Sequence, residues 1–351
     1  MAQIRLNIKE ARASGRSFAA ASQRGSQHRQ SALTGDGLIL PAGAEDRERD
    51  PVGLQAKIQA TVDETIAADL VEQLAMHGLH DRGRRLSELR DDSVSHDWLW
   101  RISSAHGPIV PRSEFQTGVR LRVGADCIRP GTGCARCGAV MQGSASHAFC
   151  CALPEATTGH YDVRNAILPL AHLADSSTSL EPLGLIPSHP SLRPADLLCS
   201  AAYPGRLAAL DVGVTSPDAS GAGDDCCENM YQRKRGDYRQ HLKELEIDQQ
   251  ILYRPLIWST WGRCHREAQC VLRTLSVQAA RRHGLRDHSL ILRRTHAAIG
   301  VQLVRRTVRM LRACTPFLHD AEAHLLLAEP GFSALPGSRE VVLLAGEAGA
   351  R

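Results

Sequence analysis

The sequence lacks the segments that would carry the chain into or across a membrane. No apolar run among its 351 residues approaches the length of about 20 residues that a membrane-spanning helix needs. No apolar stretch follows Met1, so we expect no secretory signal peptide. The charge is also nearly balanced, at +4, and the overall charge therefore points only weakly to any class of partner.

A secreted disulfide framework is a further class that the sequence disfavours, although cysteine is abundant. The chain has 11 cysteines, but this number is odd, and the chain is long enough to bury ordinary hydrophobic cores. A reducing compartment in which some of the cysteines bind metal fits these features best.

Composition sets the first 50 residues apart from the rest. They are poor in aromatic side chains, and Glu10 is the only acid before Ser31, among many Arg, Ser, Ala and Gln residues. This composition predicts a disordered leader. It is also compatible with a mitochondrial-type transit peptide, which is the alternative.

Hydrophobic spacing and turn residues predict a helical N-terminal part followed by a region of strands and helices. The first helix is expected to end near Met76, where Gly78 can stop it. Beyond it, short apolar runs and turn signals predict two adjacent strands, a helix, a third strand and a long helical segment. The expected ranges are 195–201 and 206–215 with a turn at 204–205, then 226–245, 251–259, and 267–314 with breaks near 284 and 300.

One set of cysteine and histidine residues has the spacing of a zinc ligand set. Cys134, Cys137 and His147, followed by Cys150 or Cys151, give a paired-cysteine turn and a returning segment with two more donors. Four nitrogen and sulfur donors close a tetrahedron, which predicts a structural zinc site without an open position for water. Ordinary buried thiols are the alternative, and Cys127 is either a spare ligand or free.

Two aspartates are placed where adjacent strands could bring them together. Side chains alternate along a strand, so Leu210 and Val212 are expected to face the core and Asp211 the opposite face. A charge on such a strand is costly unless it is exposed or binds something. Asp196 lies at the start of the preceding strand, and two carboxylates suffice to hold a magnesium ion that keeps several waters.

The expected helix after these strands supplies a basic residue. Many nucleases of this design carry a lysine two residues after the second acid, but that position here is Gly213. Lys234 is a candidate substitute, and Tyr238 lies one helical turn further on. Taken without other information, Lys234 is equally readable as a solvated surface charge.

Arginine is concentrated near the C-terminal end of the helical region. Between residues 276 and 317 Asp287 is the single acid, whereas the arginines are Arg281, Arg282, Arg286, Arg293, Arg294, Arg305, Arg306, Arg309 and Arg312. Such a block can bind phosphate backbones or acidic protein surfaces. The alternative is a solvated arginine-rich helix face.

Together these residues resemble the C-terminal region of non-LTR retrotransposon polyproteins that carry a restriction-like endonuclease. In that family a CCHC knuckle precedes a His-Arg element, an R/K-P-x-D strand, a strand with a second Asp, and a helix bearing K-x-x-x-Y. The matching residues, in the same order, are Cys134, Cys137, His147, Cys151, His160, Arg164, Arg193, Pro194, Asp196, Asp211, Lys234 and Tyr238. The resemblance covers about residues 80–315, and the segment 253–259 is similar to the family's next strand.

The resemblance implies an α/β fold with a small mixed sheet flanked by helices, of the restriction-endonuclease type. A zinc knuckle and a helical N-terminal part would precede this core. The segments that we expect are a leader at 1–50, a helical segment at 51–125, the knuckle at 126–155, the nuclease core at 156–275, a basic helical segment at 276–330 and a tail at 331–351.

The resemblance also implies a function, which is hydrolysis of DNA phosphodiesters, with RNA as a further candidate substrate. Asp196 and Asp211 would hold Mg²⁺, assisted by Lys234 and Tyr238, while Cys134, Cys137, His147 and Cys151 would hold Zn²⁺. The residues implied in nucleic-acid binding are His160, Arg164, Arg193, Arg305 and Arg306. A nuclear location would follow, with mitochondrial or cytoplasmic location as alternatives.

Two departures from the family pattern leave other functions open. Gly213 provides no lysine beside the second acid, and no reverse-transcriptase palm precedes the segment. The endonuclease could therefore be active or degenerate. The alternatives are a non-catalytic, zinc-dependent nucleic-acid-binding remnant and a zinc-stabilised domain that binds proteins.

Overall fold

The computed structural model describes residues 51–101, 104 and 107–315. The expected leader at 1–50, the tail at 331–351 and the part of the basic segment beyond 315 lie outside the described residues. The chain divides into two compact units, Met1–Leu86 and Ser87–Arg351. Among the described helices, none is long and apolar enough to cross a membrane.

Helices make up the described part of the first unit. Helix α3 (Pro51–Met76) ends where the sequence predicts, and the chain reverses at Gly78, whose φ of +70° lies in the left-handed region that glycine tolerates best. The N–H of Leu79 then bonds to the carbonyl of Leu74 at 2.8 Å, which closes the end of the helix. Helix α4 (His80–Arg90) follows and continues across the boundary between the units.

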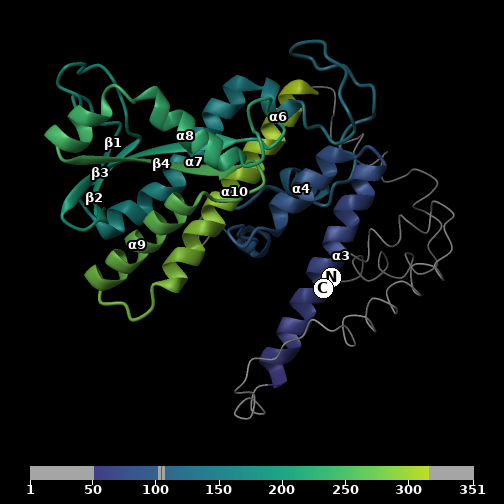
Figure 1. Cartoon of the computed structure of the whole chain (residues 1–351), viewed down its shortest axis with the longest axis horizontal. Helices are drawn as coiled ribbons and strands as arrows, with labels where there is room; N and C mark the ends of the chain where they lie inside the picture. The colour runs from purple at the N-terminus through teal and green to yellow at the C-terminus, as the bar shows by residue number, and fades with distance from the viewer. Residues whose placement is uncertain (1–50, 102–103, 105–106, 316–351) are drawn as a thin grey trace, which may run out of the picture. The chain divides into compact units, whose positions relative to one another are not determined.

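The second unit is built around a four-stranded mixed sheet in the order β1-β2-β3-β4 (Figure 1). The β1-β2 and β2-β3 pairs are antiparallel, whereas β3 and β4 are parallel. The bounds are β1 (Ser179–Leu180), β2 (Leu197–Tyr203), β3 (Arg206–Thr215) and β4 (Ile251–Ser259). The strands expected at 206–215 and 251–259 are confirmed, and the one expected at 195–201 begins and ends two residues later in the chain.

Helices cover both faces of this sheet, so the mixed α/β architecture with flanking helices is confirmed. Leu210 and Val212 of β3 face a core shared with the first helical layer, as the alternation predicts. That layer consists of α7 (Leu153–Ala174), α9 (Arg266–Arg282) and α10 (Ser289–Cys314). The opposite face is covered by α8 (Cys226–Asp237) and the short π-helix η4 (Glu244–Asp248).

A second hydrophobic core lies beside the sheet and joins the cysteine-rich segment to α10. Its large side chains include Trp98, Phe149 and Trp261, and the rings of Phe149 and Trp261 meet edge to face at 5.4 Å. The elements that contribute are η2 (Asp97–Trp100), α5 (Arg112–Arg122), α6 (Ala148–Cys151) and the C-terminal half of α10. The cysteine-rich segment is thus packed against the rest of the second unit.

Two expectations about helices are wrong. The helix expected at 226–245 ends at Asp237, because Tyr238 turns away to donate its hydroxyl to the carbonyl of Arg193 at 3.2 Å. No break occurs at Gly300, which lies inside the continuous α10, although the break near Gly284 is confirmed. A Cβ at Gly300 would lie 3.1 Å from the Trp98 ring, so this glycine serves close packing.

Candidate functional site

Asp196 and Asp211 meet where β2 begins and β3 reaches its middle. The backbone N–H of Asp196 donates to the carbonyl of Leu210 at 2.9 Å. Oδ2 of Asp196 accepts the N–H of Val212 at 2.7 Å, so its carboxylate is held beside the backbone on either side of Asp211. The charge of Asp196 acts on Asp211. The expected strand pairing therefore brings the two acids together.

Lys234 of α8 reaches the second of these acids. Its Nζ lies 2.6 Å from Oδ1 of Asp211, and both side chains are largely buried. The stem of the lysine passes over Gly213, where an added Cβ would lie 3.0 Å from its Cε and 2.6 Å from Cδ1 of Ile257. The glycine that replaces a strand lysine thus also makes room for the helix lysine.

The surroundings shift the two aspartates in opposite directions. Burial raises the pKa of Asp211 above its ordinary value, against the attraction of Lys234. Burial also acts to raise the pKa of Asp196, but hydrogen bonds from His160 and from the Val212 N–H outweigh it, and the pKa of Asp196 is lowered. Nε2 of His160 donates to Oδ1 of Asp196 at 3.1 Å, which connects α7 to the site.

Tyr253 of β4 is a site residue that the sequence analysis did not assign. Its hydroxyl donates to Oδ2 of Asp211 at 2.6 Å, so both oxygens of that carboxylate have a partner. Tyr238, which was expected to contribute directly, instead packs its ring against Tyr253 at 5.2 Å. The expected strand at 253–259 pointed to Tyr253, but only the parallel β3-β4 register shows that it faces Asp211.

Glu181 holds both arginines of the expected His-Arg and R-P-x-D elements. It forms ion pairs with Arg164 and with Arg193, the latter at 3.2 Å. Its N–H donates to the carbonyl of Asp196 at 2.9 Å, and its φ of +44° is unusual for a residue other than glycine. Such strain occurs most often at functional sites. Arg164 also lies 4.8 Å from the centre of the Tyr161 ring.

Arg305 and Arg306 do not have the positions expected of nucleic-acid contacts. Arg306 is only 5% exposed, and its stem packs so closely on Gly159 that a Cβ there would lie 2.3 Å away. Burial lowers the pKa of Arg306 to about 10. Nε of Arg305 pairs with Glu114 at 3.2 Å. Much of the arginine-rich segment therefore serves packing and internal ion pairs, because α10 crosses the centre of the second unit.

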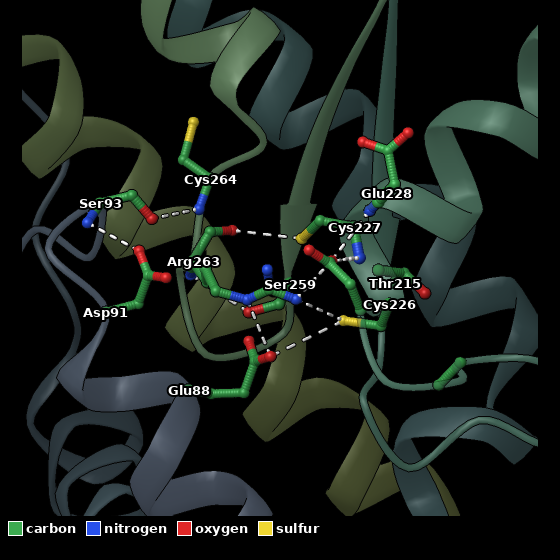
Figure 2. A network of polar contacts seen from close by, with 12 residues as sticks. Glu88, Asp91, Ser93, Thr215, Cys226, Cys227, Glu228, Ser259, Arg263 and Cys264 are labelled. Atoms are coloured by element: carbon green, nitrogen blue, oxygen red, sulfur yellow. Dashed lines mark hydrogen bonds and ion pairs between the residues drawn. The ribbon is translucent and has the colours of Figure 1, made fainter.

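The helix that carries Lys234 is anchored at its start by a polar network. Asp225 caps α8 by accepting the N–H groups of Cys227 and Glu228, each at 2.9 Å. Arg263 pairs with Asp225 at 2.8 Å and also with Glu88 at 2.8 Å (Figure 2). This network fixes the N-terminus of α8 against the β4–α9 turn. Cys226 contacts Arg263 there, so the Cys226–Cys227 pair belongs to packing around the network.

The four residues expected to bind zinc form one cluster. The donor atoms of Cys134, Cys137, His147 and Cys151 all lie within 4.8 Å of one another. The Sγ atoms of Cys134 and Cys151 are 3.9 Å apart, and Sγ of Cys137 lies 3.2 Å from Nε2 of His147. This set could hold a metal ion, and three sulfurs with one nitrogen are compatible with structural zinc.

The local structure explains this cluster and decides the choice of the fourth donor. Cys151 belongs to the cluster, whereas Cys150 is exposed and its thiol contacts Ser216. Burial acts to raise the pKa of Cys134, but N–H groups of the turn, of which Arg136 is one, lower it to about 6. A lowered thiol pKa favours the thiolate that binds metal. Cys127 is buried outside the cluster.

The structure therefore separates the expected site residues into two groups. Asp196, Asp211, Lys234 and His160 converge, with Arg164 and Arg193 linked to them through Glu181. Arg305 and Arg306 lie elsewhere. Within the described residues, no group of three or more candidate metal ligands includes either aspartate. A scan against protein-family models and a search of curated proteins found no match to this chain.

Proposed function

We propose that the second unit is a metal-dependent DNA endonuclease domain of the non-LTR retrotransposon type, with the Cys/His cluster as its structural zinc knuckle. The observation that carries the proposal is the meeting of Asp196 and Asp211 with Lys234 above Gly213. A lysine two residues beyond the second acid is missing, and the ammonium of Lys234 reaches that acid from the helix instead.

The donor set at the two aspartates suits magnesium, which binds through one or two carboxylates and keeps several waters. Each carboxylate already accepts hydrogen bonds within the protein, but a carboxylate oxygen has two lone pairs and can take a further partner. Bound there, the ion would activate a water and polarise the scissile phosphate. Asp196 and Asp211 would hold the ion, and Lys234 would stabilise negative charge on the phosphate.

Arg164 and Arg193 are the side chains best placed to contact the DNA backbone beside this site. Arg193 is 57% exposed, and Arg164 lies on Tyr161, which is itself exposed. Both guanidinium groups are paired with Glu181, so a phosphate would compete with that carboxylate. Bidentate pairing of arginine with phosphate is strong enough for such an exchange.

The second candidate function is a nucleic-acid-binding remnant without catalysis. It is favoured by the internal pairing of the site, because Lys234 and Tyr253 engage both oxygens of Asp211 and Glu181 engages both arginines. A site that has lost its metal would be stabilised by such contacts. The two candidates differ in whether DNA is cut and agree in that DNA is bound.

Nicking of supercoiled plasmid by the full chain in Mg²⁺ tests the proposal. We expect Asp211→Asn and Lys234→Met to lower the nicking rate by at least about 100-fold, since each removes charge from the reacting phosphate or its ion. Asp237→Asn and Arg233→Met are matched controls on the exposed surface of α8 and should cut normally. DNA binding without nicking would favour the remnant, and equal nicking by Asp211→Asn would refute the assigned site.

A further inference from the structure

A fifth thiol lies at the Cys/His cluster, contributed by a helix far away in the sequence. Cys314 is the last residue of α10 and is fully buried. Its thiol makes hydrogen-bonding contacts with the thiols of both Cys134 and Cys151. Its backbone carbonyl accepts the N–H of Ala135 at 2.9 Å, which fixes the end of α10 beside the paired-cysteine turn.

Packing alone does not account for the place of this thiol. A buried cysteine can act as a small apolar side chain, and Cys314 does belong to the hydrophobic core that includes Phe149 and Leu311. Its sulfur, however, adjoins two sulfurs of the cluster at once, which is the environment of a metal ligand. Cys150 provides the contrast, because it is next to Cys151 in the chain and its thiol contacts Ser216 instead.

Five donors are thus available where zinc takes four. Among them Cys137 is exposed and Cys134 is buried, as is Cys314. Replacing the Cys137 sulfur by the Cys314 sulfur would leave three sulfurs and one nitrogen around the ion. The charge of the centre and its tetrahedral geometry would be unchanged, so the exchange has no electrostatic cost of its own.

We propose that Cys314 is an alternative metal ligand, which gives the centre two sets of four donors. Cys134, His147 and Cys151 belong to both sets, and Cys137 or Cys314 is the fourth. Metal bound through Cys314 ties the C-terminal end of α10 to the cysteine-rich segment. This proposal rests on the ability of the cluster to bind a metal, and it is independent of the proposed nuclease activity.

Metal content of single and double variants of the full chain tests the proposal. We expect Cys137→Ser to retain roughly one zinc per chain, because Cys314 completes the ligand set. The Cys137→Ser/Cys314→Ser double variant should lose it, and Cys314→Ser alone should keep it through Cys137. Cys150→Ser is the matched control and should bind as the unaltered protein does. In the cobalt-substituted Cys137→Ser protein, the thiolate charge-transfer absorption should remain that of three sulfurs.

Two results would overturn the proposal. One is loss of zinc from Cys137→Ser to the same extent as from the double variant; the other is an unaltered protein that binds no zinc. A second measurement covers variants that fold poorly. In the Cys137→Ser protein, zinc should protect Cys314 from alkylation by iodoacetamide, as read by peptide mass spectrometry. Equal alkylation of Cys314 with and without zinc would make it a packing residue.

Discussion

Replacement of Lys234 by methionine isolates the charge interaction at the centre of the site. The substitution removes the ammonium that lies 2.6 Å from Oδ1 of Asp211. Methionine keeps an unbranched stem that can still cross Gly213, so the packing changes little. Asp211 is left buried, with the hydroxyl of Tyr253 still donating to its other oxygen.

The magnitude follows from the burial of this pair. Removal of one partner from a buried ion pair costs about 3–5 kcal/mol. Because Tyr253 continues to stabilise the carboxylate, we expect the lower end of that range, about 3 kcal/mol at neutral pH. The free energy of unfolding of Lys234→Met should therefore be lower than that of the unaltered protein by this amount.

The loss should depend on pH in a defined direction. Burial raises the pKa of Asp211 in the folded protein, and removal of Lys234 raises it further. A carboxyl with a higher pKa in the folded than in the unfolded state favours folding at low pH and costs stability as the pH rises through the raised pKa. The deficit of Lys234→Met should thus be small near pH 4 and complete near pH 8.

Urea unfolding of four proteins measures this effect. The set is the unaltered chain, Lys234→Met, Asp211→Asn and the double variant, with Arg233→Met as the exposed control on α8. We expect the double variant to be more stable than Lys234→Met, because the unpaired charge is gone. A loss below about 0.5 kcal/mol in Lys234→Met at neutral pH, or no coupling in the cycle, would show that Lys234 is a solvated charge.

Three further substitutions test the rest of the site. Gly213→Ala should lower the free energy of unfolding by about 1–3 kcal/mol in chemical denaturation, since its Cβ would displace Lys234 and a buried isoleucine; Gly236→Ala, which meets open space in the same region, should not destabilise. Arg263→Met should cost about 3 kcal/mol in the same assay, because two carboxylates lose their partner; an unchanged midpoint would contradict the anchoring of α8. Glu181→Gln should free two arginines and steepen the salt dependence of DNA binding by a slope of about 0.9 for each new phosphate contact, measured by titration at several salt concentrations; a flat response would remove those arginines from the interface.

Local features of the sequence determined much of the framework. The alternation of residues in β3 placed Leu210 in the core and Asp211 opposite to it, because side chains of a strand alternate whatever packs against them. The paired cysteines and the returning histidine of the cluster are close in the sequence, so their spacing limits where they can be. Pro255 also carried information, since a residue without an N–H belongs at a sheet edge, and β4 is an edge strand.

Tertiary structure alone decided which distant groups meet. The distance from Lys234 to Asp211, the approach of Tyr253 and the burial of Arg306 all depend on how helices pack on the sheet. Neither hydrophobic periodicity nor residue spacing specifies such packing, because the same sequence of elements can be docked in several ways. For the same reason Cys314 gave no signal as a neighbour of the Cys/His cluster until the end of α10 was in place.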